Sequence, residues 1–479
     1  MYTRTKALVT AIDNIQEINI EANIQRGMFA FSVLGTPYRY SKKIKEKIKV
    51  VLKQYNIKLP NKRITVEVEK CESKYNYDEL DFAILVSILK LLNIKEFDNN
   101  NLYIGSISLL GDLVPLEYPY RLINYYNDNQ DVIINMPYDK KLVNLEMCQD
   151  LRMIEDIDGL LNNDYKLLKV FNFNEIKHDD DHAIDLNSII GQENLIRALI
   201  IALAGRHHLI VTGVSGTGKS LSFKAIESII PLSDRAELLE INNFTKEDET
   251  FITKLQVNKL EKNITLNQLK GSTRKISRLK MLIPSVVVLE ELNNYSKNIL
   301  EFLKEEMDYD RIESNYKGQV TIFANMNPCP CGNYGSKVNT CKCSMGEISR
   351  FENALKKPFY DRFQIKVRTD SEYNIQDTKN KYNIDEVRNK IKTAWDMQKE
   401  RYKDLGIRYN AFLTVDELEH YIGLEDKLER KLSELTEFYK LSLRQKHNII
   451  KIARTIADYD HEDKIKADHL YEAISYQII

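Results

Sequence analysis

A glycine-rich run directly after an apolar segment is the feature that most constrains this chain. It follows the apolar residues 209–212 and reads, in order, Gly213, Val214, Ser215, Gly216, Thr217, Gly218, Lys219 and Ser220. The glycines let backbone N–H groups turn toward a phosphate, Lys219 neutralises β and γ oxygens, and the Ser220 hydroxyl can reach Mg²⁺. An ordinary glycine-rich turn is the alternative. The pattern favours a phosphate-binding loop between a strand over 209–212 and a helix over 219–230, as in an α/β nucleotide-binding unit.

Hydrolysis of a bound nucleotide requires a second, acidic strand end. The apolar run 286–289 is followed by Glu290 and Glu291. ATP-driven motors normally place Asp first, to hold Mg²⁺, and Glu second, to polarise the attacking water. We therefore assign Glu290, with Ser220, to the Mg²⁺ shell and Glu291 to the catalytic base. Because Glu290 is longer than the usual Asp, the rate of hydrolysis is an open question, and two acids at a strand end also occur on ordinary surfaces.

Two further polar positions fit the same chemistry. The apolar run 320–324 leads to Asn327, whose amide can orient the attacking water if it lies beside the γ-phosphate. An Asn-Pro turn is the alternative for this position. Arg362 lies between Asp361 and Phe363, where in ring ATPases an arginine reaches into the neighbouring subunit's nucleotide site.

Four of the six cysteines lie close together in the sequence, at Cys329, Cys331, Cys341 and Cys343. Four thiolates suit tetrahedral Zn²⁺ in a closed structural site, and a reducing compartment favours metal binding over bridges. The single-residue separations are tighter than the usual spacing of about two to four residues. Packed free thiols and disulfides therefore remain alternatives to zinc.

The charge balance excludes a chain that binds nucleic acid through its overall charge. There are 69 basic and 70 acidic side chains, so any DNA contact must be local. No apolar run reaches the roughly 18 to 20 residues that span a bilayer, and residues 1–13 lack the apolar core of a secretory signal. We expect no membrane contact and a cytoplasmic location.

The periodicity of apolar residues predicts three domains and one linker. The first is an α+β domain over 1–170. It is predicted from alternating strands within 7–33, a helix after 41 with Ser41 as its cap, a strand over 63–68, a helix over 80–92 and a hairpin within 102–116. It is followed by a polar linker over 171–187, a P-loop core over 188–375 with a Cys-rich insertion at 329–343, and an all-α lid over 376–479. The lid should bury the stripe Ile449, Ile452, Ala453 and Ile456.

Taken together, these motifs resemble those of a known family, the magnesium-chelatase-like AAA+ proteins of the ComM/YifB group. The resemblance rests on the phosphate-binding loop, on 326–332 (Met-Asn-Pro-Cys-Pro-Cys-Gly), and on the segments 191–193, 204–207, 341–343, 358–363 and 453–458. Weaker similarity runs through the N-terminal domain, in 29–37, 63–66 and 81–84, so that the resemblance covers nearly the whole chain. It implies an ATP- and Mg²⁺-dependent motor that assembles as a homo-oligomer, a hexameric ring. It also implies a Lon-protease-like (S5-type) N-terminal fold and branch-migration, helicase-like work on DNA in recombination or natural transformation.

The resemblance also assigns residues. Arg444 would be the lid arginine that touches the γ-phosphate, with Arg454 as the second choice. Lon-type proteolysis needs a serine nucleophile and a lysine base, and no serine stands in the right setting near 78–81. The N-terminal domain should therefore be proteolytically silent.

One segment departs from the family pattern. Between 243 and 284 the family usually carries a histidine pair and a glycine-rich loop, whereas this chain has the basic segment 270–280. Such a segment can grip the backbone of single-stranded or branched DNA without reading bases, or it is a solvated loop. A protein-remodelling, chaperone-like or chelatase-type ATPase, and a nucleotide-switched binding module with little turnover, therefore remain alternatives to a DNA motor.

Overall fold

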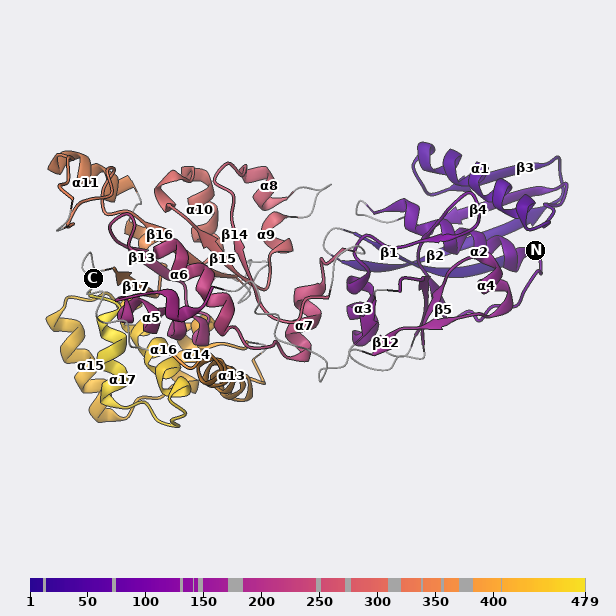
Figure 1. Ribbon diagram of the computed structural model, residues 1–479. Coiled ribbons are helices and arrows are strands. Elements are labelled where there is room, and N and C mark those ends of the chain that lie inside the picture. Colours follow the sequence, from indigo (N-terminus) through magenta and orange to yellow (C-terminus); the bar gives the residue numbers. More distant parts are fainter. Residues whose placement is uncertain are drawn as a thin grey trace. The chain divides into compact units, whose positions relative to one another are not determined.

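The chain forms two compact units, which are described separately (Figure 1). The computed structural model describes residues 1–11, 14–70, 75–129, 132–140, 142–144, 150–170, 184–246, 251–271, 277–308, 320–336, 339–354, 357–369, 382–405 and 407–478. The first unit comprises 1–176, 235–252 and 271–277, and the second comprises 177–234, 253–270 and 278–479. Most of the predicted linker, 171–183, lies outside the described residues.

The first unit is built on a mixed sheet of eight strands in the order β11-β10-β8-β5-β1-β2-β4-β3. The long strands β1 and β2 pair antiparallel, as the sequence predicted, whereas β3 pairs parallel with β4. The strands are β1 (Tyr2–Thr10), β2 (Ile15–Gln25), β3 (Ala30–Leu34), β4 (Arg63–Val68), β5 (Asn101–Tyr103), β8 (Ile133–Pro137), β10 (Leu151–Ile154) and β11 (Lys166–Leu167). Two smaller sheets pair β6 (Ser106–Ile107) with β7 (Leu113–Val114) and β9 (Val143–Asn144) with β12 (Lys169–Val170).

The helices of this unit are α1 (Tyr38–Gln54), α2 (Asp81–Leu91), α3 (Pro119–Asp128), α4 (Ile157–Asn162) and α7 (Arg235–Asn242), with a 3₁₀ turn at Tyr77–Leu80. The apolar residues of α2 are almost wholly buried, which makes it the central helix of the core. The prediction that Ser41 caps α1 is wrong. The helix begins at Tyr38 because Pro37, with φ fixed at −56°, occupies the N-cap, and the Ser41 hydroxyl donates to the carbonyl of Tyr38.

Residues 235–252 lie in the sequence between parts of the second unit but pack in the first. Asn124 on α3 donates to the carbonyl of Leu239 and to the side chain of Asn243, both at 2.7 Å. The rings of Tyr120 and Phe251 are in contact, with their centres 5.4 Å apart and their planes tilted by 47°. This excursion falls inside the range 188–375 that the sequence assigned to the core.

The second unit has a sheet of five parallel strands in the order β14-β15-β16-β13-β17. Its strands are β13 (Leu209–Thr212), β14 (Gln256–Lys259), β15 (Ser285–Leu289), β16 (Val320–Met326) and β17 (Ile365–Arg368). Alternate strand residues enter two different cores. Leu209, Val211 and Val286 face one, while Ile210, Val287 and Ile322 face the other, so helices cover both faces of the sheet.

The first of these faces is covered by α5 (Glu193–Gly205), α6 (Lys219–Ala225) and the C-terminal helices, and the second by α8 (Leu266–Lys270), α9 (Arg278–Met281) and α10 (Lys297–Glu306), as Figure 1 shows. Further short elements are α11 (Met345–Ala354), α12 (Lys357–Tyr360) and the 3₁₀ turns Leu186–Ser188, Ile226–Ile229 and Leu292–Asn294.

Every regular element described after residue 382 is helical. These are α13 (Ile384–Arg401), the turn Asn410–Phe412, α14 (Val415–Tyr421), α15 (Asp426–Phe438), α16 (Leu443–Tyr459) and α17 (Ala467–Ser475). A capping box between Ser442 and Gln445 starts α16. Its predicted stripe Ile449, Ile452, Ala453 and Ile456 is fully buried, which confirms that prediction. Among the described residues, no helix is both long and apolar enough to cross a membrane.

Candidate nucleotide-binding site

The glycine-rich run is a turn that joins the carboxyl end of β13 to α6, as predicted. Gly216 and Gly218 have φ angles of +85° and +83°, which residues with a Cβ rarely adopt. The loop is anchored at Gly213, whose N–H donates to the carbonyl of Met326 at the end of the neighbouring strand β16 (3.3 Å). The same turn places Lys219 in the first turn of α6.

Lys219 is buried and points back over its own loop. Its Nζ donates to the carbonyl oxygens of Gly213 (2.6 Å) and Val214 (2.7 Å). Burial lowers the pKa of Lys219 to about 8, and the nearby carboxylate of Glu291 acts in the opposite direction. An ammonium group with few water contacts can exchange these carbonyls for phosphate oxygens at little cost in desolvation.

Glu290 and Glu291 follow β15 directly and have different surroundings. Burial raises the pKa of Glu290, but hydrogen bonds from Lys259 and from the Ser220 hydroxyl outweigh it, and the net shift is downward. The contact with Ser220 brings together the two oxygen groups that the sequence assigned to Mg²⁺. Glu291 is half exposed, and its carboxylate pairs with Lys262, which lowers its pKa.

Two amides at the end of β16 lie beside these groups. Asn327, the predicted water-orienting residue, accepts a hydrogen bond from the Ser215 hydroxyl (3.4 Å). Asn325, which sequence reasoning missed, accepts from the backbone N–H of Glu291 (2.8 Å) and lies 3.5 Å from the Ser220 hydroxyl. The sequence signal for Asn325 was an amide inside a mostly apolar strand. Asn325 is 2% exposed, and a buried amide requires partners.

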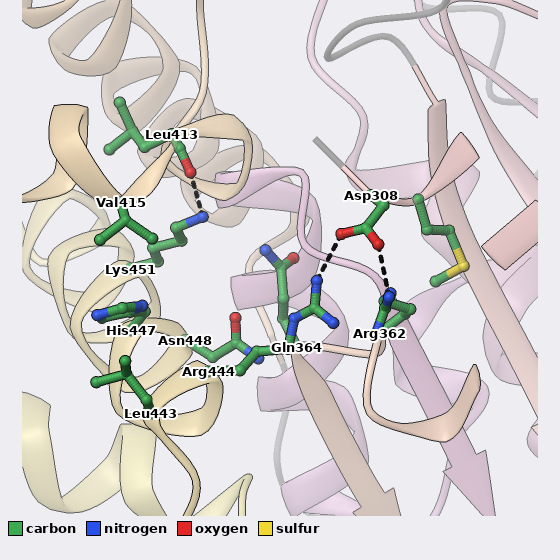
Figure 2. Close-up of a pocket in the computed structure, with 11 residues that line it drawn as sticks. Asp308, Arg362, Gln364, Leu413, Val415, Leu443, Arg444, His447, Asn448 and Lys451 are labelled. Carbon is green, nitrogen blue, oxygen red and sulfur yellow. Dashed lines mark hydrogen bonds and ion pairs between the residues drawn. The ribbon is translucent and has the colours of Figure 1, made fainter. Parts of the chain in front are cut away.

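The two predicted arginines Arg362 and Arg444 meet at one carboxylate in the second unit. Figure 2 shows that both point at Asp308, just after α10, and the N···O distances are 2.5 Å to Arg362 and 2.6 Å to Arg444. They line a cavity of about 310 Å³ with His447 and Asn448 of α16, and no residue of 213–220 contributes to its lining.

Arg454, the second choice for the lid arginine, is a structural residue. It is 5% exposed and contacts Asp458, which is fully buried and also pairs with Arg401. Its remaining N–H groups donate to the carbonyls of Glu462 and Asp463. An arginine with all of these partners is committed to the helical core, so the assignment of Arg454 to phosphate binding is wrong.

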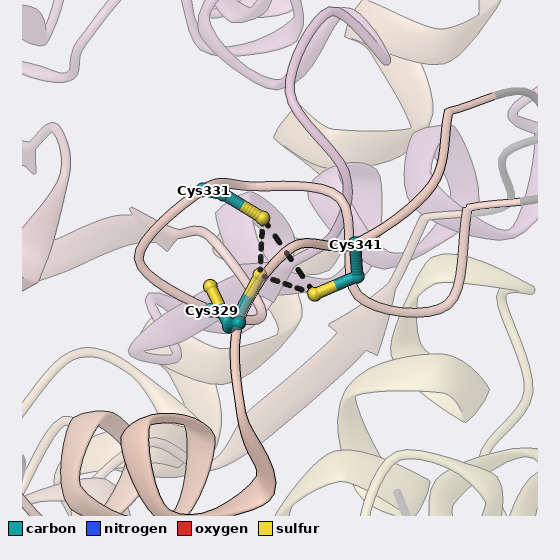
Figure 3. A group of neighbouring side chains, drawn as sticks. Cys329, Cys331 and Cys341 are labelled. Carbon is teal, nitrogen blue, oxygen red and sulfur yellow. Dashed lines mark hydrogen bonds between the residues drawn. The ribbon is translucent and has the colours of Figure 1, made fainter.

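The four cysteines of the insertion form one cluster (Figure 3). The sulfur of Cys329 lies 3.4 Å from that of Cys331 and 3.7 Å from that of Cys341, and the sulfurs of Cys331 and Cys341 are 3.6 Å apart. The sulfur of Cys343 belongs to the same group, since all four sulfurs lie within 4.8 Å of one another. These separations exceed the disulfide bond length of about 2.05 Å and approach the roughly 3.8 Å between thiolates around one tetrahedral Zn²⁺. Backbone N–H groups of Lys342 and Asn333 lower the pKa of Cys331 to about 6. The cluster can therefore hold a metal ion.

Comparison with known proteins agrees with this geometry. The chain matches the family described as "Magnesium chelatase, subunit ChlI" over residues 185–377, its C-terminal family over 382–477, and "Subunit ChlI of Mg-chelatase" over 20–137. Competence protein ComM of Haemophilus influenzae is 25% identical, in an alignment that covers 96% of this chain and 94% of that protein.

The chain belongs to the magnesium-chelatase-like ComM/YifB family. Within this ComM/YifB family, the YifB protein of Escherichia coli is 24% identical over 97% of this chain and 95% of its own length. A protein of Mycobacterium tuberculosis is 20% identical, in an alignment that covers 96% of this chain and 95% of that protein. The second unit accordingly has the α/β fold of a magnesium-chelatase-like AAA+ ATPase.

The segment in which the chain departs from the ComM/YifB pattern is only partly described. Residues 272–276 of the basic segment 270–280 lie outside the described residues. Lys270, at its start, lies over the ring of Phe302 with 5.1 Å to the ring centre.

Proposed function

We propose that this protein is an ATP-hydrolysing ring motor that remodels or translocates DNA. The observation that carries the proposal is the convergence of the loop 213–220, Glu290, Glu291 and Asn327 at one edge of the parallel sheet. A crevice at the carboxyl ends of parallel strands is where open α/β folds bind nucleotides. The family match and the similarity to ComM support the same activity.

Each residue of the site has a role in this proposal. Lys219 exchanges its carbonyl partners for the β- and γ-phosphate oxygens. Ser220 and Glu290 offer oxygen ligands that suit Mg²⁺, which supplies positive charge beside the phosphates when bound. Glu291 polarises the attacking water, with its backbone fixed by Asn325, and Asn327 orients that water.

Arg362 and Arg444 complete the site of a neighbouring subunit. Each is held by Asp308 in a cavity that none of the residues 213–220 lines. A carboxylate that bridges two guanidinium groups can hold the place of a phosphate, because the oxygens of both groups accept hydrogen bonds from the planar fork of arginine. We infer that the γ-phosphate of the neighbour's ATP replaces Asp308, and that the chains assemble as a ring, a hexamer by resemblance to the family.

DNA as the substrate rests on the similarity to a protein named for competence and on the basic segment 270–280. ATP turnover should be measured without nucleic acid, with single-stranded DNA and with a four-way junction. We expect DNA to raise turnover several-fold. Stimulation only by a protein client would support a protein-remodelling or chelatase-type ATPase instead, and tight ATP binding without turnover would support a nucleotide-switched binding module.

The cysteine cluster is proposed to hold a structural Zn²⁺. The sulfur separations suit tetrahedral zinc, and the reducing cytoplasm expected from the sequence would keep the thiols available. Elemental analysis of protein purified without chelator should give about one zinc per chain. Metal-free protein that is equally stable and active would contradict this site.

The N-terminal unit is proposed to lack protease activity. Lys47 lies 3.4 Å from the Ser106 hydroxyl, which is a possible Ser–Lys pair that the sequence did not reveal. Lys47 is, however, ion-paired with the buried Asp81, which also accepts from Ser106 (3.0 Å) and Tyr40. Lys47 is therefore engaged in an ion pair with a buried carboxylate, which is a structural role and not that of a catalytic base.

A further inference from the structure

The cysteine cluster and the phosphate-binding loop are joined through Gly332. Gly332 follows Cys331, and its N–H donates to the carbonyl oxygen of Cys329 (3.0 Å). Its own carbonyl oxygen accepts a hydrogen bond from the backbone N–H of Ser215 in the phosphate-binding loop (3.2 Å). Gly332 therefore makes one backbone hydrogen bond to a residue of the cluster and another to a residue of the loop.

The contact requires glycine. Gly332 has a φ of +79°, and a Cβ at this position would lie 2.5 Å from the Ser215 hydroxyl oxygen and 3.8 Å from the side-chain carbon of Asn327. Ser215 and Asn327 are themselves in contact at 3.4 Å. The peptide next to Cys331 is thus packed directly against the loop and against the proposed water-orienting amide.

The position of Ser215 affects how the loop presents its amides. Ser215 precedes Gly216, where the backbone takes the positive φ that begins the turn. The N–H of Gly213 is held by the carbonyl of Met326 and that of Ser215 by the carbonyl of Gly332. Two fixed points therefore precede the N–H groups that would bind a phosphate in the proposed site. Loss of the second point would let these N–H groups turn away from the nucleotide.

We propose that zinc at the four cysteines and nucleotide at the loop 213–220 bind cooperatively, with Gly332 as the positioning residue that couples them. This inference rests on the ATP and zinc sites proposed above. Without metal, no bond to a shared ion holds the sulfurs of Cys329 and Cys331 to those of Cys341 and Cys343. The carbonyl of Gly332, next to Cys331, is then free to leave the N–H of Ser215. Because coupling between two ligands is reciprocal, bound nucleotide raises zinc affinity by the same factor.

The test compares the full-length protein with and without zinc. Metal is removed with a chelator under reducing conditions, and the affinity for a fluorescent non-hydrolysable ATP analogue is measured before and after Zn²⁺ is added back. We expect zinc to raise this affinity about fivefold or more, and saturating analogue to raise the affinity for zinc, measured by chelator competition, by a similar factor. Equal affinities in the two states would overturn the coupling.

Gly332→Ala tests the route of the coupling. The four cysteines remain, so about one zinc per chain should be retained, while analogue affinity falls and the affinity for zinc no longer responds to analogue. Gly346→Ala is the matched control, because a Cβ on Gly346 in α11 meets nothing within 4 Å, and it should behave as the parent. A folded Gly332→Ala protein with parental coupling would overturn the role of Gly332. If this variant does not fold, the comparison of zinc-loaded and zinc-free parent decides alone.

The outcomes separate this inference from the proposed function. Zinc-loaded parent that binds no analogue would refute the ATP site itself. Parent that takes up no zinc would refute the metal site, and the coupling with it. Parent that binds both ligands independently would refute only the coupling.

Discussion

Glu290 and Glu291 are adjacent in the sequence, yet they contact different partners. Glu290 accepts from Ser220 beside the phosphate-binding loop, whereas Glu291 is fixed through its backbone by Asn325 and has a half-exposed carboxylate. Glu291 takes a left-handed backbone conformation, with φ of +54°. This change in backbone direction gives the two carboxylates different surroundings, so each can be tested separately.

Glu291→Gln should bind the ATP analogue with parental affinity, because the amide is nearly isosteric, but should lower ATP turnover by about 10²- to 10⁴-fold through loss of the base. Glu290→Gln should instead raise the Mg²⁺ concentration needed for half-maximal turnover. Steady-state turnover and analogue binding, measured on both variants, check this. If Glu290→Gln loses turnover and Glu291→Gln hydrolyses at the parental rate, then the base is Glu290.

The lowered pKa of Lys219, about 8 without nucleotide, predicts a pH-dependent affinity. Phosphate beside Lys219 favours the charged ammonium and raises its pKa, so binding takes up a proton above about pH 8. Affinity for the analogue should then fall as pH rises from about 8 to 9.5, by at most about tenfold per pH unit. A pH-independent affinity across this range would contradict the argument.

At the scale of helices and strands, α16 carries two arginines with different surroundings. Arg444 lies in its first turn, and its side chain is 38% exposed, whereas Arg454 is buried against Asp458 in the middle of the helix. Arg444 is therefore partly open to solvent, whereas Arg454 holds α16 to the segment that follows it.

Arg454→Ala should destabilise the second unit by about 3–5 kcal/mol, because it leaves the buried carboxylate of Asp458 with fewer partners. Arg444→Ala should leave stability within about 1 kcal/mol of the parent but lower ATP turnover. Denaturant unfolding followed by the fluorescence of Trp395, the chain's one tryptophan and a buried residue of α13, measures both effects. Equal destabilisation by the two variants would contradict the distinction.

Sequence reasoning succeeded for these elements where local pattern decides the structure. The strands over 209–212 and 63–68 have the predicted bounds, and the buried stripe of α16 follows from helical periodicity. Asp308 and Gly332 could not be assigned, because their roles depend on partners that are distant in the sequence. The pairing of Asp308 with Arg362 and Arg444 exists only after folding brings three separate segments together.

At the scale of the whole molecule, the proposed active site requires more than one chain. Arg362 and Arg444 share a cavity to which the chain's own loop 213–220 contributes no lining residue, as the proposed sharing of active sites between subunits requires. If each active site is formed by two subunits, then a chain that lacks the loop's lysine can still supply arginines to its neighbour.

The measurement that tests this most directly is the ATP turnover of Lys219→Ala, of Arg362→Ala and of an equimolar mixture of the two. Lys219→Ala should lose nucleotide binding, because the charge on the phosphate oxygens is gone, and Arg362→Ala should bind nucleotide nearly normally but lose most turnover. The mixture should regain part of the parental rate, since some interfaces pair an intact loop with an intact arginine. Parental turnover by folded Lys219→Ala, or by a monomeric Arg362→Ala, would contradict an ATPase with shared active sites.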